Sequence, residues 1–124
     1  MVFTFVSAVF LSILGKIDVK GLAHITGGGV RNLLRLNQNV AFVLEDLFEP
    51  QPIFSFLQEN GNVELKEMYQ TFNMGTGFMI IVSEDSYKET IGILRKTADT
   101  NVKTIGYIEK GEGVHILDLD IKYH

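Results

Sequence analysis

The chain contains no cysteine and no tryptophan, and it has only 2 prolines among its 124 residues. The absence of cysteine excludes disulfide bonds, thiolate zinc sites and cysteine nucleophiles, and it agrees with a reducing compartment. A chain of this length buries about two thirds of the surface that it exposes when unfolded, so it can form a core without cross-links. We therefore expect one cytoplasmic domain that spans residues 1–124.

Clusters of basic residues are also missing. The chain has 11 lysines and arginines against 15 aspartates and glutamates, which gives a formal net charge of -4. Proteins bind nucleic-acid backbones chiefly through clustered cations, so we expect no nucleic-acid partner. The histidines and carboxylates do not show the spacing of metal ligands, and we expect no metal site within this chain.

The first 15 residues lack any charged side chain. A membrane-spanning helix needs about 20 apolar residues. A signal peptide needs a basic beginning, whereas the first cation here is Lys16. We therefore predict neither a membrane segment nor secretion, but a helix over residues 2–14 that is apolar on nearly all sides. Part of such a surface needs a partner, and we expect self-association through it.

Apolar periodicity and turn residues predict alternating helices and strands. Glycines at 111 and 113 favour a tight hairpin between the last two strands. The predicted strands are 19–26, 39–45, 77–82, 102–109 and 114–119. The predicted helices are 2–14, 30–36, 52–60, 64–72 and one that Ser83 caps. This order indicates a layered α/β domain, with a mixed sheet of four or five strands packed with helices.

The sequence His24-Ile25-Thr26-Gly27-Gly28-Gly29 stands where a predicted strand ends and a predicted helix begins. Glycines allow successive backbone N–H groups to converge, and the start of a helix adds donors and a positive dipole end, so phosphate would be a natural ligand. The same glycines would equally suit a plain tight turn or a close approach of two elements. The sequence is not a P-loop, because no Gly-Lys-Ser/Thr follows.

Alternation along the strand would place the side chains of His24 and Thr26 on one side and that of Ile25 in the core. An imidazole beside the glycine turn could handle a proton, although a single histidine on a strand is commonly structural. His115 and His124 have no partner spacing, and we expect them at the surface.

A second glycine-bearing turn, Phe72-Asn73-Met74-Gly75-Thr76-Gly77, precedes the most apolar strand. Asparagine tolerates the left-handed conformation, so the turn could be purely structural. Alternatively, Asn73 could offer its amide to a ligand at the edge of the sheet.

Five segments together resemble one family. The combination, in order over residues 16–115, is similar to the C-terminal domain of aminoimidazole ribonucleotide synthetase, also called phosphoribosylformylglycinamidine cyclo-ligase. The segments are KIDVKGLAHITGGG (16–29), NLLRL (32–36), IFSFLQENGNV (53–63), EMYQTFNMGTGF (67–78) and KGEGV (110–114).

This resemblance implies an enzyme of de novo purine biosynthesis. Such an enzyme converts formylglycinamidine ribonucleotide and ATP into aminoimidazole ribonucleotide, ADP and phosphate, with Mg²⁺ neutralising phosphate charge. In the family an N-terminal domain carries most of the ATP and metal binding, and the C-terminal domain completes the cleft. The resemblance implies a proton-handling or polarising role for His24. It also implies binding of a phosphate or of the substrate by Thr26, Gly27, Gly28 and Gly29, with Asn73 and Gly75 at the border, and it leaves open which phosphate the glycine turn holds.

The sequence departs from the family in two places. No segment resembles the N-terminal ATP-binding domain with its acidic metal-binding motifs, and the first helix is apolar where the family has polar and basic residues. We therefore expect a chain that is inactive alone, either as a fragment or as the partner of a separately made N-terminal half.

Two further functions stay open. Another ATP-dependent member of the superfamily, such as selenophosphate synthetase, thiamine-monophosphate kinase, a hydrogenase-maturation protein or formylglycinamidine ribonucleotide synthetase, would share the fold. The paired HITGGG and FNMG motifs favour the cyclo-ligase over these. A non-catalytic interaction module would instead use the apolar first helix for docking.

Overall fold

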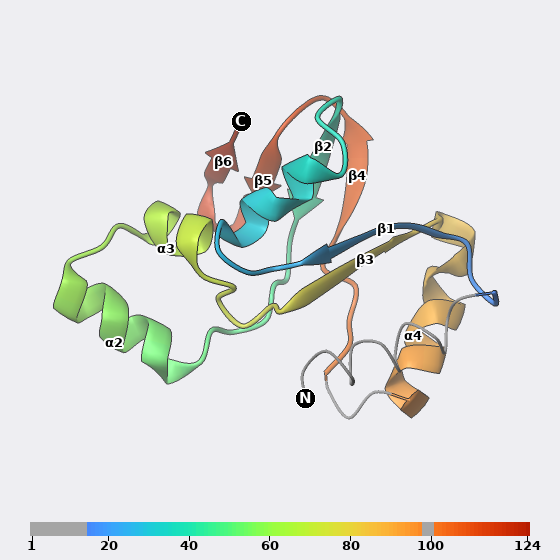
Figure 1. Ribbon diagram of the computed structural model, residues 1–124, viewed down its shortest axis with the longest axis horizontal. Helices are drawn as coiled ribbons and strands as arrows, with labels where there is room; N and C mark the ends of the chain where they lie inside the picture. Colours follow the sequence, from blue (N-terminus) through green and yellow to red (C-terminus); the bar gives the residue numbers. More distant parts are fainter. Residues whose placement is uncertain (1–14, 98–100) are drawn as a thin grey trace. The chain divides into compact units, whose positions relative to one another are not determined.

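The computed structural model describes residues 15–97 and 101–124 (Figure 1). The predicted helix over residues 2–14, and with it the predicted surface for self-association, lies outside the described residues. The described chain forms two compact units. One contains residues 15–22, 80–97 and 101–104, and the other contains residues 23–79 and 105–124.

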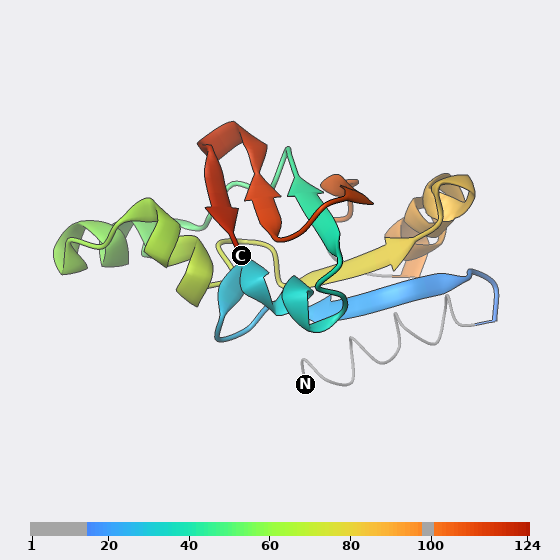
Figure 2. The same ribbon diagram turned by 90° about the horizontal axis from the view of Figure 1, so that it is seen from above.

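A two-stranded sheet joins β1 (Val19–His24) to β3 (Phe78–Val82), and Figure 2 shows the two strands side by side. This pair is separate from the larger sheet. The apolar core of the first unit gathers around buried Ile17 and Leu94. Leu94 belongs to α4 (Tyr87–Thr97) and packs with partly buried side chains of Val19, Ile80, Val82, Ile93 and Val102.

The sequence predicts that Ser83 caps the helix that corresponds to α4. In the structure a short 3-10 turn, η2 (Glu84–Ser86), stands between Ser83 and α4. The Ser83 hydroxyl donates to Ser86 Oγ at 3.0 Å and makes no capping hydrogen bond to a backbone N–H. Thr90 Oγ1 donates to the carbonyl of Ser86 at 2.7 Å, which ties the first turn of α4 to η2.

The second unit contains a four-stranded sheet with the order β4-β2-β5-β6. Its strands are β2 (Val40–Leu44), β4 (Gly106–Lys110), β5 (Val114–Ile116) and β6 (Ile121–Tyr123). β2 runs antiparallel to β4 and parallel to β5, and β6 runs antiparallel to β5. The predicted mixed sheet of four or five strands packed with helices is thus confirmed by a mixed four-stranded sheet.

Two details of this sheet differ from the prediction. β4 and β5 do not form a hairpin, because β2 lies between them and pairs with both. The predicted strand 114–119 ends at Ile116, where the 3-10 turn η3 (Leu117–Leu119) begins and leads into β6. Asp120 closes η3 in the left-handed conformation, with φ of 52°. The prediction of a tight hairpin from Gly111 and Gly113 was therefore wrong, because glycines allow a change of chain direction but do not determine which strands pair.

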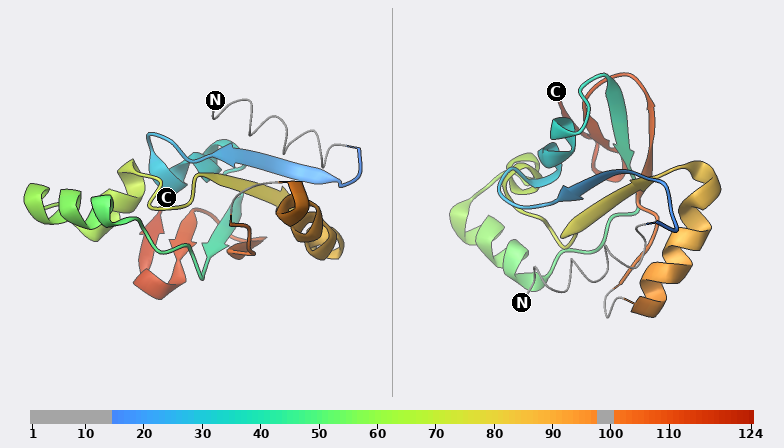
Figure 3. Two further views of the ribbon diagram at one scale, coloured as in Figure 1. Left: turned by 90° about the horizontal axis from the view of Figure 1, so that it is seen from below. Right: turned by 45° about the vertical axis from the view of Figure 1, so that its right-hand side comes forward.

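The helical elements of the second unit are η1 (Gly29–Arg35), α2 (Pro52–Gly61) and α3 (Leu65–Thr71). Proline at the first position of α2 fits the start of a helix, and Asn62, with φ of 50°, ends it in the left-handed conformation in place of the predicted Gly61. Figure 3 shows α3 between α2 and the four-stranded sheet. α3 buries Met68 and Tyr69, whereas α2 buries none of its residues.

Candidate functional site

The two glycine-bearing turns that the sequence singled out lie next to each other. Both belong to the second unit, where the backbone N–H of Ile25 donates to the carbonyl of Gly77 at 2.9 Å. This bond joins the end of β1 to the residue that precedes β3. The fold therefore brings together the HITGGG and FNMGTG segments, which are about 50 residues apart in the sequence.

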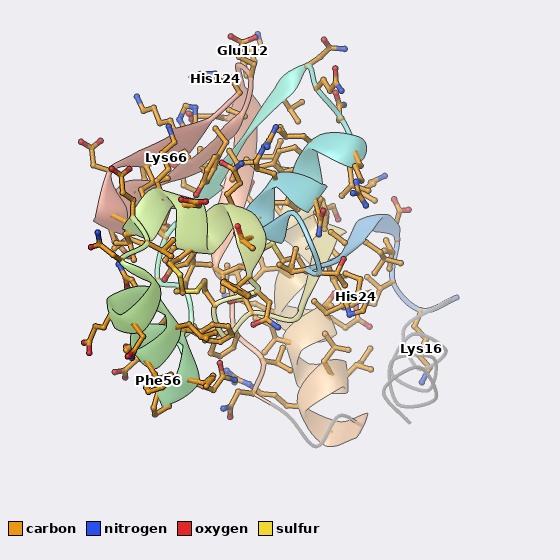
Figure 4. The ribbon with its side chains drawn as sticks, turned by 60° about the vertical axis from the view of Figure 1, so that its left-hand side comes forward. Lys16, His24, Phe56, Lys66, Glu112 and His124 are labelled. Atoms are coloured by element: carbon orange, nitrogen blue, oxygen red, sulfur yellow. The ribbon has the colours of Figure 1, made fainter. Side chains whose placement is uncertain are left out.

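The side chains at the end of β1 alternate as expected. Ile25 is buried, whereas His24 and Thr26 are exposed. The imidazole of His24 lies against the ring of Phe78, with ring centroids 5.9 Å apart and planes tilted by 35°, and Figure 4 marks its place beside β1. Asn32 Nδ2 donates to the carbonyl of His24 at 3.2 Å. The backbone of His24 is therefore tied to η1 while its ring stays open to solvent.

Of the three glycines, Gly29 has a clear packing role. Its φ is 54°, and a Cβ added to it would stand 1.9 Å from the carbonyl oxygen of Tyr69. Gly28 also has a positive φ, 104°, and an added Cβ would stand 2.8 Å from Asn32 Oδ1. Gly27 differs from both, because an added Cβ there would meet no atom within 4 Å. Close packing therefore explains Gly29 and contributes at Gly28, but it does not explain Gly27.

The predicted α-helix after the glycines is a seven-residue 3-10 helix, η1. The spacing of buried Val30 and Leu33 suits its three-residue turn. Two donors near its start are already engaged, because Gly29 N–H donates to Thr26 O at 2.9 Å and Arg31 N–H donates to Gly28 O at 3.2 Å. Among the described residues, the N–H groups of Gly27 and Gly28 have no such backbone acceptor. A short helix supplies little dipole, so any anion here would depend on these two amides and the Thr26 hydroxyl.

Asn73 and Gly75 shape the second turn. Asn73 Oδ1 accepts a hydrogen bond from Gly75 N–H at 3.0 Å, and Asn73 O accepts one from Thr76 N–H at 3.0 Å. Gly75 has φ of 93°, and an added Cβ would stand 3.0 Å from the carbonyl of Glu49. The structural reading of this turn is therefore well founded, and it leaves Asn73 Nδ2 as the group that could reach a ligand.

Thr76 is a residue that sequence reasoning missed. Its side chain is buried, and Oγ1 has no hydrogen-bond partner among the described residues. A hydroxyl buried without a hydrogen-bond partner lowers the stability of the folded chain, so Thr76 is not explained by stability and becomes a candidate functional residue. The only signal in the sequence was a polar residue flanked by two glycines.

Two buried tyrosines, Tyr69 and Tyr123, lie in the second unit, and Tyr69 contacts the first glycine turn. Tyr69 provides the carbonyl against which Gly29 packs. The Tyr123 hydroxyl donates to the carbonyl of Lys66, so β6 is tied to α3. Burial raises the pKa of Tyr123 to about 12, with a smaller lowering by Arg31 and a further rise from Tyr69. Burial also raises the pKa of Tyr69. Both phenols therefore keep their protons at neutral pH and act as packing groups.

Metal ligands and the remaining histidines add little to the site. Within residues 15–97 and 101–124, no three histidine, aspartate or glutamate side chains stand close enough together to hold a metal ion. His115 was expected at the surface but is partly buried, with its ring centroid 6.5 Å from that of exposed His124. No helix in the described part of the chain has the length and apolar character needed to cross a bilayer.

Comparison with known proteins gives a consistent picture. The family model described as "AIR synthase related protein, C-terminal domain" matches residues 2–118. The chain is 45% identical over 104 residues to a phosphoribosylformylglycinamidine cyclo-ligase of Methanopyrus kandleri, covering 84% of this chain and 30% of that protein. It is 42% identical over 106 residues to the protein of the same name from Thermoplasma volcanium, covering 86% of this chain and 30% of that one.

A third cyclo-ligase, from Methanocaldococcus jannaschii, is 52% identical over 80 residues, which are 64% of this chain and 23% of that protein. The chain thus spans less than a third of the length of these relatives. All three similarities agree with the segments that suggested the family and with the mixed sheet that the fold contains. Since the family model covers nearly all of its residues, the chain belongs to the AIR synthase related family and corresponds to its C-terminal domain.

Proposed function

We propose that this chain is the substrate-side domain of a phosphoribosylformylglycinamidine cyclo-ligase, which closes the imidazole ring of a purine precursor at the expense of ATP. The observation that carries the proposal is the 45% identity over 104 residues to a protein of that name. The adjacency of the HITGGG and FNMGTG turns supports it, because exposed Thr26 and Gly27 in the first turn and half-buried Asn73 in the second suit a phosphorylated substrate.

In this proposal the substrate phosphate meets the hydroxyl of Thr26 and the amides of Gly27 and Gly28. Gly29 acts indirectly, since its contact with Tyr69 holds the turn in place. Exposed His24 polarises the substrate or carries a proton next to the phosphate. Asn73 and Gly75 form the neighbouring turn that borders the ligand.

ATP and Mg²⁺ belong to the proposed reaction, in which ATP activates the substrate's formyl amide oxygen and the metal neutralises phosphate charge. The described residues do not fit a magnesium site, because they bring no cluster of three acidic or histidine side chains together. We therefore assign ATP and its metal to a part of the enzyme that this chain does not match.

The test of the glycine turn is a pair of substitutions at Gly27. Gly27→Asp and Gly27→Ala both fit the open space there, and the backbone does not have a positive φ. The aspartate places a negative charge at the turn, so we expect it to weaken binding of formylglycinamidine ribonucleotide about tenfold or more. The alanine variant keeps every backbone amide and should bind as the unchanged chain does.

Isothermal titration calorimetry measures both affinities, with inorganic phosphate as a second ligand. Equal affinity of the aspartate variant and the unchanged chain for both ligands contradicts an anion site at this turn. It would leave the non-catalytic interaction module as the better reading.

A further inference from the structure

The outer strand of the four-stranded sheet has an open edge. Among the described strands, β4 pairs only with β2, and Figures 1 and 2 both show it outside β2. Glu45 N–H donates to Ile105 O at 2.8 Å, whereas Phe42 N–H donates to Gly113 O on the opposite side of β2. Odd-numbered residues of β2 therefore bond to β4, and even-numbered ones bond toward β5.

The register extends this parity to β4. Val43 is paired with Tyr107 and Ala41 with Glu109, so these two β4 residues turn their N–H and C=O groups inward to β2. The backbone groups of Gly106, Ile108 and Lys110 consequently point outward. Within residues 15–97 and 101–124, no other strand pairs with this ladder of donors and acceptors at the edge of the sheet.

An apolar row crosses the sheet and ends at this edge. Directly paired residues share a face, so Tyr123, Val114, Phe42 and Ile108 form one row from β6 to β4. The first three side chains are at most 4% exposed, whereas Ile108 is 41% exposed. The row is thus covered along its length and open only where the sheet stops.

We propose that β4 pairs antiparallel with β4 of a second copy of this chain, centred on Ile108. In that register the outward-facing residues meet each other, because Ile108 lies opposite the Ile108 of the second copy and Gly106 lies opposite Lys110. The apolar row then runs unbroken from one sheet into the other. The proposal concerns a surface remote from the glycine turns in sequence, and it holds whichever reaction the chain serves.

Charge favours a second copy as the occupant. In the centred register Glu109 faces Tyr107 and Lys110 faces Gly106, so no two like charges stand opposite each other. The other edge strand, β6, has only three residues, and its middle residue is Lys122. A β6 pair centred there would set two lysines against each other. β4 has no proline and its central residue is uncharged, so only Glu109 and Lys110 at its C-terminal end carry the charge that usually protects an edge strand.

A disulfide trap tests the register. The chain has no cysteine, so Ile108→Cys introduces a single thiol. Hydrogen-bonded antiparallel partners have Cα atoms about 5.5 Å apart, which is within reach of a disulfide. Phe56→Cys is the matched control, because Phe56 is an apolar residue that is 59% exposed and lies on α2, where Figure 4 labels it.

We expect mild oxidation to link Ile108→Cys chains at least about tenfold faster than Phe56→Cys chains, as measured by non-reducing gel electrophoresis. Equal rates for the two variants, or no disulfide at position 108, would overturn the proposal. This test works even if neither cysteine substitution changes how strongly two chains associate.

Charge substitutions give a second test that separates lost pairing from lost folding. Ile108→Glu and Ile108→Lys each place like charges opposite each other, so each variant alone should associate at least about tenfold more weakly than the unchanged chain. An equimolar mixture should restore dimers, because glutamate then faces lysine. Sedimentation equilibrium measures all four samples. Dimers of either single variant as stable as those of the unchanged chain, an unchanged chain that is monomeric throughout, or a mixture that stays monomeric would each contradict β4 pairing.

Discussion

Neighbouring glycines of one motif do different work in this chain. Gly29 is required by the packing of η1 on α3, where the carbonyl of Tyr69 occupies the space that any side chain would need. Gly27, two residues earlier, has open space around it. A triple glycine is therefore not one signal, and its members separate into a packing position and a candidate binding position.

A first prediction follows from this contrast. Gly29→Ala combines a positive φ with a Cβ that would overlap the Tyr69 carbonyl, so the free energy of unfolding should fall by about 2 to 5 kcal/mol. Gly27→Ala should change it by less than about 0.5 kcal/mol. Urea denaturation followed by circular dichroism measures both values. A near-neutral Gly29→Ala would mean that η1 and α3 are not packed as described.

Tyr123 makes stability depend on alkaline pH. Its pKa rises from 10.0 to about 12 on folding, so the folded chain holds the phenol proton more tightly than the unfolded chain. The protonated phenol therefore stabilises the folded chain fully below pH 10.0, and this contribution is lost as the pH rises toward 12. The two pKa values correspond to a fall of about 2 to 3 kcal/mol in the free energy of unfolding.

Tyr123→Phe should remove most of this alkaline loss. It should also cost about 1 kcal/mol at neutral pH, because the carbonyl of Lys66 loses its donor. Denaturation curves recorded across the alkaline range compare the two chains. The same decline in both would assign the effect to another group, such as Tyr69, whose pKa burial also raises.

Among the secondary-structure elements, β2 and β4 show how position in a sheet shapes sequence. β2 is apolar throughout, and Ala41 to Leu44 are all buried, as a central strand requires. β4 is exposed along most of its length, because among the strands that the structure describes it has a neighbour on one side only. Substitutions at successive β4 residues can test which backbone N–H groups bond to β2 and which point outward.

Proline substitutions at adjacent positions of β4 should have unequal effects. Tyr107→Pro removes an N–H group that the register directs to Val43 on β2, and it leaves a buried carbonyl without its donor. We expect this change to cost about 1 to 3 kcal/mol of unfolding free energy. Ile108→Pro removes an outward N–H group and should cost clearly less. Denaturation at a concentration where the chain is monomeric measures the difference. Equal costs would refute the assigned hydrogen-bond parity.

For the whole molecule, the proposed function makes a prediction about catalytic activity. We expect no turnover from this chain alone, and ATP-dependent product when it is combined with the part of the Methanopyrus kandleri relative that it does not match. Product from the purified chain alone would contradict the proposed role of the chain as one side of a cleft.

In the combined enzyme, His24→Gln should lower kcat by about tenfold to a thousandfold if the imidazole handles a proton or polarises the substrate. KM should change much less, because the amides of Gly27 and Gly28 remain. Because the side chain of His24 is exposed, we expect the substitution to leave the fold intact, and a loss of kcat would then not come from misfolding. An unchanged kcat would mean that His24 has no catalytic role and that its ring serves only to contact Phe78.

Local patterns in the sequence were sufficient for most of the strands and helices, for the turn at Gly27 and Gly28 and for the family, but not for the 3-10 elements η1 and η3 or for β6. The apolar run of β2, the proline that begins α2 and the alternation around Ile25 each depend on neighbouring residues, whose preferences are visible in the chain itself. Only the tertiary structure showed that β2 separates β4 from β5 and that Tyr69 occupies the space beside Gly29. These are contacts between residues distant in sequence, and packing selects them by burying surface that no short segment can cover alone.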